Sequence, residues 1–196
     1  MLKILRSSLL GLLALPLAAQ APGFSAGGGF IVGLDSLKKA THNTLGFNLG
    51  ADYSFRIPET EMDARVGLSL GLMPGSEQNG LKTSLTLFQA HGDMVIETTA
   101  KGLFAVAGLS LNTYSMSRSG TESQDPMDRD HHFPVRDAKG LKLGLRLGIA
   151  YAFNARFSGE LLVQQTELSG KDLQDPFVRQ GGANPAWIEL NARYHF

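Results

Sequence analysis

The residues most able to do chemistry in this sequence are isolated charges that alternate with apolar residues. In several stretches every second residue is Gly, Ser, Asn or Ala, and a single acidic or basic residue interrupts that polar series. Six such charges, of both signs and at similar depth in their stretches, are Asp52, Arg65, Arg146, Glu160, Glu189 and Arg193. Charges that are removed from water need partners of opposite sign. We therefore expect a compensated polar cluster, in which Arg146 lies with Glu160 and Glu189, and a narrow gated or solute-binding pore is the alternative use of the same residues.

A second concentration of chemistry-bearing residues lies in the longest polar segment, residues 116–139. Residues 125–132 read Asp-Pro-Met-Asp-Arg-Asp-His-His, and carboxylates with imidazoles are ligands for Zn²⁺ or Ca²⁺. The run lacks the glycine and the terminal glutamate of EF-hand spacing. A solvated loop is the favoured interpretation, and we expect no metal and no cofactor.

A catalytic function would require a serine, a histidine and a carboxylate brought together. The candidates outside the long loop are His42 with Ser36 or Ser169, and their spacing does not single them out. The run Gly27-Gly28-Gly29 begins an alternating stretch and not a helix, so it does not match the nucleotide-binding fingerprint. We therefore expect no enzyme activity. The formal net charge of zero also gives no electrostatic reason to expect nucleic acid binding.

Alternation with a period of two predicts extended strands with two chemically different faces. Eight stretches show it, and together they indicate an all-β chain: 24–34, 43–55, 63–72, 82–97, 102–115, 141–153, 156–168 and 187–196. The fourth stretch changes parity near Leu87 and Phe88, which predicts a β-bulge or a misplaced boundary. With the bulge, His91 and Asp93 would join the polar face.

The connections between these stretches alternate in length, and each odd-numbered connection is longer than the one that follows it. An even number of strands with alternating short turns and long loops is typical of an antiparallel up-and-down transmembrane β-barrel. Eight aromatic residues on the apolar parity fall near one end of their strands and would form a girdle at the lipid interface: Phe24, Tyr53, Phe55, Tyr151, Phe153, Phe157, Tyr194 and Phe196. An eight-stranded barrel has an interior that side chains fill or that holds one small ligand.

The last stretch, residues 187–196, alternates strictly and ends on Tyr194-His195-Phe196. It resembles the terminal recognition segment of Gram-negative outer-membrane β-barrels, which the barrel-assembly machinery reads. The mature chain as a whole resembles the small barrels of the OmpA transmembrane domain, OmpX or OmpW type. This resemblance implies a location in the outer membrane, contact with its lipid and lipopolysaccharide, and periplasmic chaperones during biogenesis. It also implies a monomer.

The first 21 residues read as a secretory signal peptide. Lys3 and Arg6 are followed by a short apolar run, and small residues permit cleavage after Ala19 or Ala21. Residues 22–196 then form the barrel domain, and the absence of cysteine excludes a disulfide framework. We expect secretion through the inner membrane to the outer membrane.

These features predict a structural or surface-interaction role for a barrel whose lumen is plugged by side chains. A narrow, porin-like channel for small or hydrophobic solutes is the main alternative. A lipid A-modifying barrel enzyme and a soluble lipocalin-like binder are further alternatives. In a lipocalin-like barrel the apolar parity would face inward.

Overall fold

The computed structural model describes residues 23–34, 37–38, 43–60, 62–78, 81–120, 138–166 and 186–196. Nearly all of these residues lie in strands, as the alternating sequence predicts. The strands are β1 (Gly23–Gly33), β2 (Leu45–Arg56), β3 (Met62–Met73), β4 (Glu77–Gln78), β5 (Leu81–Glu97), β6 (Leu103–Gly120), β7 (Ala138–Ala152), β8 (Phe157–Thr166) and β9 (Ala186–His195).

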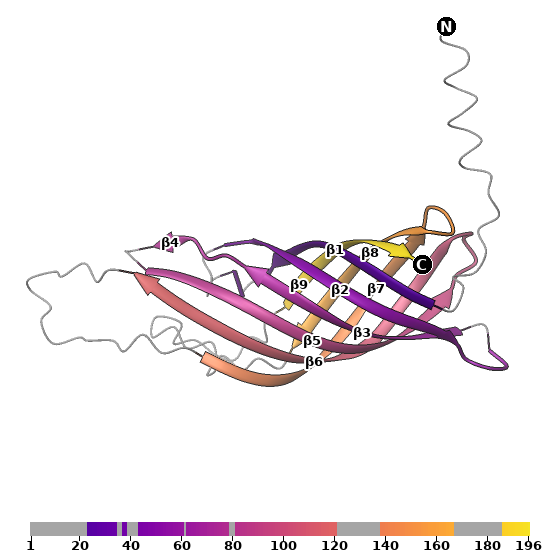
Figure 1. The fold of residues 1–196 in the computed structure, drawn as a ribbon, viewed down its shortest axis with the longest axis horizontal. Coiled ribbons are helices and arrows are strands. Elements are labelled where there is room, and N and C mark those ends of the chain that lie inside the picture. The colour runs from indigo at the N-terminus through magenta and orange to yellow at the C-terminus, as the bar shows by residue number, and fades with distance from the viewer. Residues whose placement is uncertain are drawn as a thin grey trace, which may run out of the picture.

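The strands close into a ring in which every neighbour is antiparallel (Figure 1). Sequential strands pair with one another, β3 pairs with β5, and β1 pairs with β9 to close the sheet. The two-residue β4 lies outside this ring and pairs only with the start of β5. The predicted all-β, eight-stranded antiparallel up-and-down barrel is therefore confirmed.

One end of the barrel carries the short connections β2–β3, β5–β6 and β7–β8, and the other end carries the long ones. We call them the short-turn end and the long-loop end. At the β7–β8 turn, Asn154 Oδ1 accepts hydrogen bonds from the backbone N–H groups of Arg156 and Phe157, at 2.8 and 3.0 Å. Among the described residues there is no helix long and apolar enough to cross a membrane.

The strand β5 differs from its prediction, because it contains no bulge. Its register with β3 runs without interruption from Leu85 to Ile96, and its register with β6 is equally continuous. Leu85 and Leu87 are buried on the same parity as His91 and Asp93, while Phe88 faces outward. The apparent change of parity in the sequence arises because the inward face itself changes from apolar to polar along this strand.

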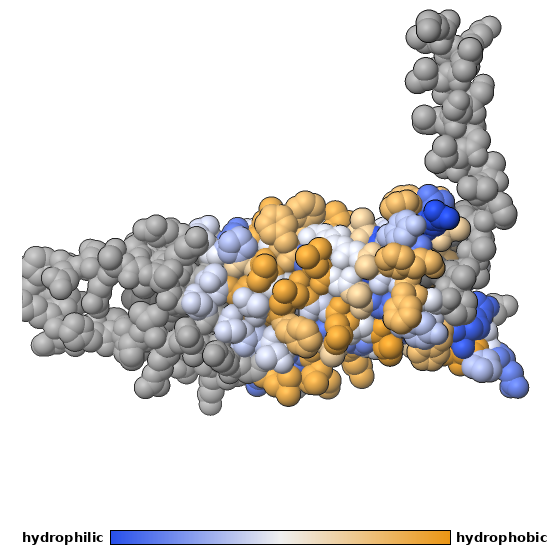
Figure 2. Space-filling model, viewed as in Figure 1, coloured by the Kyte–Doolittle hydropathy of each residue, from blue (hydrophilic) through white to orange (hydrophobic). Residues whose placement is uncertain are grey.

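The apolar parity of the barrel faces outward. Large hydrophobic side chains on every strand of the ring are exposed, from Ile96 at 40% to Leu49 at 70%, and they form a band across the visible face (Figure 2). A soluble protein does not expose an apolar surface of that extent. The arrangement is the reverse of a lipocalin-like barrel, so that alternative is wrong.

Candidate functional site in the barrel lumen

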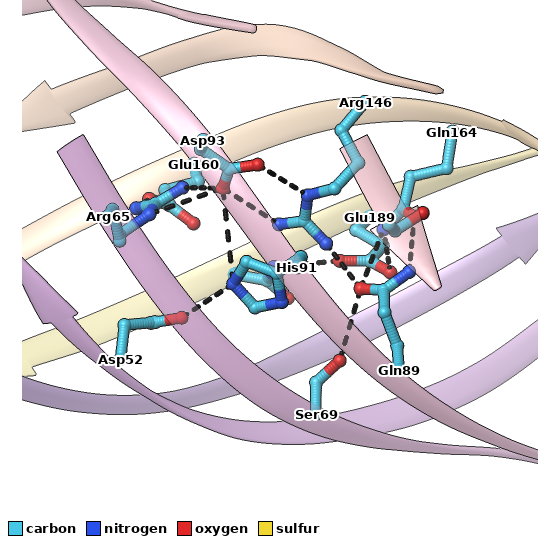
Figure 3. Close-up of polar contacts among 12 residues, drawn as sticks. Asp52, Arg65, Ser69, Gln89, His91, Asp93, Arg146, Glu160, Gln164 and Glu189 are labelled. Atoms are coloured by element: carbon cyan, nitrogen blue, oxygen red, sulfur yellow. Dashed lines mark hydrogen bonds and ion pairs between the residues drawn. The ribbon is translucent and has the colours of Figure 1, made fainter. Parts of the chain in front are cut away.

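The lumen contains a continuous network of buried charges, and Asp93 of β5 lies between two arginines (Figure 3). Arg65 of β3 donates a hydrogen bond from Nη2 to Asp93 Oδ2 at 2.8 Å, and Arg146 of β7 donates from Nε to Asp93 Oδ1 at 2.9 Å. Each of these three side chains is at most 2% exposed. Ion pairs of this kind are strongly coupled, because removing one partner leaves a buried charge without compensation.

The network continues from Arg65 to the opposite wall of the barrel. Arg65 Nη1 also pairs with Glu160 of β8, and Arg193 of β9 donates from Nε to Glu160 Oε2 at 2.5 Å. Arg193 pairs in turn with Asp52 of β2, and Asp52 Oδ1 lies 2.7 Å from His91 Nε2. Five strands of the ring, β2, β3, β5, β8 and β9, are thereby connected through their side chains.

A second branch of the network runs through neutral amides. Arg146 donates to the side-chain oxygen of Gln89, and Gln89 Nε2 donates to Gln164 Oε1 at 2.5 Å. Gln164 Nε2 donates to Glu189 Oε1 at 2.5 Å, and Trp187 Nε1 donates to the same oxygen at 2.9 Å. Among the described residues, the hydrogen-bond donors that contact Glu189 are therefore neutral ones.

The structure places the six predicted charges inside the lumen, each buried, and links them into this network. Arg146, Glu160 and Glu189 belong to this one network, but the hydrogen bonds and ion pairs of Arg146 go to other residues. Arg146 pairs with Asp93, and it connects to Glu189 only through the two glutamines. The sequence pattern placed Asp93 in the lumen only if β5 contained a bulge. In the regular β5, Asp93 faces the lumen without one, because it lies on the same side of the strand as Leu85 and Leu87.

Two layers of apolar side chains enclose the polar network, one toward each end of the barrel. These inward apolar residues were not predicted. The layer toward the long-loop end comprises Ile31, Leu37, Met73, Leu85, Leu87, Tyr114 and Trp187. The layer toward the short-turn end comprises Val95, Phe104, Val106, Ala150, Ala152 and Leu162. The layer toward the short-turn end comes from β5, β6, β7 and β8 alone, and β1, β2 and β3 contribute buried Ser25, Ser54 and Asp63 at that end. Side chains thus fill the lumen, in agreement with the narrow interior expected for eight strands.

No protein-family model matches the chain, and no curated protein matches it. Several solved structures are similar to the chain. Ail, the attachment invasion locus protein of Yersinia pestis, aligns with a TM-score of 0.56 at 12% identity and covers 89% of this chain and 99% of its own. Neisserial surface protein A aligns with a TM-score of 0.52 at 12% identity, covering 88% and 96%. The N-terminal β-barrel domain of Pseudomonas aeruginosa OprF aligns with a TM-score of 0.51 at 13% identity, covering 89% and 98%.

The chain has the fold of a small outer-membrane β-barrel. This agrees with the resemblance that its alternating strands and terminal aromatic residue suggested. At such low identity the similarity extends to the fold, and the residues inside this outer-membrane-type barrel have to be interpreted from their own contacts.

The glycines of β1 make room for the network of this outer-membrane-type barrel. Gly27 and Gly29 face the lumen, where the side chains of β9 lie across them. A Cβ atom on Gly27 would be 2.3 Å from the Ala192 carbonyl oxygen and 2.8 Å from Arg193 Cγ. One on Gly29 would be 1.9 Å from the Leu190 carbonyl oxygen and 2.7 Å from Asn191 Oδ1, so the backbone of β9 and its side chains both exclude a larger residue. Real Cβ atoms do not approach other atoms so closely, so the glycine run is required by the packing of the lumen.

The eight predicted girdle residues point outward near the short-turn end of the outer-membrane-type barrel. Several form ring pairs, with centroids 4.9 Å apart for Phe24 and Tyr53 and 5.1 Å apart for Phe157 and Tyr194. They come from β7, β8, β9, β1 and β2, or lie directly beside these strands. At the same end, β3, β5 and β6 carry aliphatic residues such as Ile96 and Leu103 on that parity. The aromatic band is therefore one-sided.

Several sequence-based candidates lie outside the described residues: Ser36, His42, Ser169, the run at 125–132 and the signal peptide at 1–21. Within the described residues, no group of three or more His, Asp or Glu side chains could hold a metal ion. Ser158 Oγ does lie 2.8 Å from His195 Nε2 at the short-turn end. Ser158 is 1% exposed, so a substrate could not reach this hydroxyl.

Proposed function

We propose that the protein resides in the outer membrane as a barrel closed to solute flow, and that it has a structural or surface-interaction role. The closed lumen supports this proposal most directly. The ion-pair network crosses the lumen from β2 to β7, and an apolar layer lies on each side of it. A conducting pore would need a continuous water path, and the ion-paired side chains that cross the narrow lumen occupy that path.

The solved structures of similar fold agree with a surface role. The names of Ail, the attachment invasion locus protein, and of neisserial surface protein A refer to attachment and to a surface location of those proteins. By analogy of fold, the long-loop end of this barrel would face outward and would contact partners, while the barrel itself provides the anchor. The proposal includes no enzyme activity.

The outward apolar band would contact outer-membrane lipid and lipopolysaccharide, and the chain would act as a monomer. The signal peptide would direct secretion, and periplasmic chaperones and the barrel-assembly machinery would act during insertion. The outward apolar band and the alternating terminal strand support these partners.

Planar-bilayer recording of the refolded barrel tests the closed lumen. We expect no stepwise conductance from the wild-type protein, in an assay where an open porin gives clear steps. The variant Arg65→Ala should lower the stability of the barrel and should still give no steps. Discrete steps from the wild-type protein, altered by Arg65→Ala, would instead establish the narrow-channel alternative.

A further inference from the structure

The polar layer of the lumen contains a small cavity that the network does not use. Its volume is about 10 Å³, counted as the space open to the centre of a water molecule. Asn48, His91 and Asn191 line it from β2, β5 and β9, and Gly50 lines it from β2. A space of this size holds about one water molecule.

Three buried side-chain atoms without a hydrogen-bond partner belong to residues that line this cavity. They are Asn48 Oδ1, His91 Nδ1 and Asn191 Oδ1. All three residues are more than nine-tenths buried. A buried polar atom without a partner is destabilising, and buried waters commonly satisfy such atoms.

The donor or acceptor role of each of these atoms determines which small molecule can bind in the cavity. Asn191 Nδ2 donates to Glu189 Oε2 at 3.2 Å, so its oxygen is the free end. His91 Nε2 lies against the carboxylate of Asp52 and carries a proton there, which leaves Nδ1 of the neutral ring as an acceptor. The cavity therefore presents acceptors, and its guest must donate hydrogen bonds.

We propose that one buried water molecule occupies this cavity and bridges β2, β5 and β9 beside the glycine-rich β1. Water donates two hydrogen bonds, so one molecule satisfies two of these three acceptors, and it can also accept from Arg146 or Arg193, which line the site. The positive charges of Arg146 and Arg193 disfavour a cation. Glu189 also lines the cavity, but its carboxylate already accepts hydrogen bonds from Gln164, Trp187 and Asn191. Because Gly27 and Gly29 have no side chains, β1 offers no side-chain hydrogen bonds at these two positions of the lumen. The water supplies hydrogen bonds there instead.

The variant Gly50→Ala tests the site, because its methyl group would enter the cavity. A Cβ atom on Gly50 would lie 3.0 Å from the Leu68 carbonyl oxygen and 3.1 Å from Ser69 Cβ, which a small shift accommodates. Gly92→Ala is the matched control, because a Cβ there would meet no atom within 4 Å. In reversible urea unfolding in lipid vesicles, we expect Gly50→Ala to lower the folding equilibrium constant about tenfold or more, and Gly92→Ala to change it less than about threefold.

A crystal structure of the wild-type barrel gives a second, independent test. We expect one water peak within hydrogen-bonding distance of at least two of the atoms Asn48 Oδ1, His91 Nδ1 and Asn191 Oδ1, unchanged when NaCl is replaced by RbCl. Gly50→Ser should restore part of the stability lost in Gly50→Ala, because its hydroxyl can donate in place of the water. An empty cavity, anomalous rubidium scattering at the site, or a Gly50→Ala variant as stable as Gly92→Ala would overturn the proposal.

Discussion

At the scale of single residues, Arg65 is a buried charge of the lumen with two ion-pair partners. It contacts both Asp93 and Glu160, and its side chain is 2% exposed. Arg56 offers a contrast on the neighbouring strand, because it pairs with Asp63 at 3.4 Å while its side chain remains 43% exposed. Burial determines how much each arginine contributes to stability.

We expect Arg65→Leu to lower the free energy of unfolding by about 3–5 kcal/mol, because two buried carboxylates lose a partner. Arg56→Ala should lower it by less than about 1 kcal/mol, as is usual for exposed ion pairs. Urea unfolding of both variants in lipid vesicles measures the difference. Equal effects would show that the network does not hold its charges away from water.

Which charges face the lumen could be predicted from the sequence, but which charges pair could not. The period of two fixes the face on which Asp52 or Arg146 lies. Pairing across the lumen depends on strand register, tilt and depth, and these come from closure of the whole ring. The link from Arg146 to Asp93 joins two strands that are not neighbours, so local alternation contains no information about it.

At the scale of elements, β5 shows how a correct period can be misread. The predicted bulge rested on the assumption that the inward face is polar along its whole length. Leu85 and Leu87 instead enter the apolar layer toward the long-loop end, while His91 and Asp93 enter the polar one. Similarly, β6 extends to Gly120 through a segment predicted as loop, because it pairs with β5 as far as Leu81.

The apolar layer toward the long-loop end makes a prediction about Trp187, the only tryptophan of the chain. It is 1% exposed and shares this layer with Leu37. We expect blue-shifted emission and weak acrylamide quenching in the folded barrel. Leu37→Ala should increase the quenching, because it removes a covering side chain. Leu49→Ala is the matched control on the outward face and should leave the quenching unchanged, whereas equal quenching in both variants would contradict the layer.

The outward face of β7 makes a prediction about lipid contact. Leu147 lies in the middle of the apolar band and is 49% exposed. We expect Leu147→Arg to lower the free energy of unfolding in vesicles by about 2–4 kcal/mol, since a charge there would face the bilayer midplane. Ser115→Arg, which lies on the outward parity nearer the long-loop end, should lower it by less than about 1 kcal/mol. Similar losses at the two positions would contradict the proposed membrane position.

At the scale of the whole molecule, the number of strands, their antiparallel order and the two ends of the barrel could be predicted from the sequence. Alternation and connection lengths are local, and they suffice for an up-and-down topology. The layering of the lumen could not be predicted, because it requires knowing which inward residues from eight strands lie at the same depth. Closure by β1 and β9 fixes those depths, with Gly29 opposite Asn191.

The most direct test of the central claim, that the apolar parity faces lipid and the polar parity forms a closed lumen, is tryptophan quenching by brominated lipids. The native Trp187 serves as the inward probe. In a Trp187→Phe background, Leu49→Trp, Leu68→Trp, Leu109→Trp and Leu147→Trp place outward probes on four different strands. We predict strong quenching at all four outward positions and little at Trp187. Quenching of Trp187 as strong as that of the outward probes, or no quenching at the outward positions, would contradict the account.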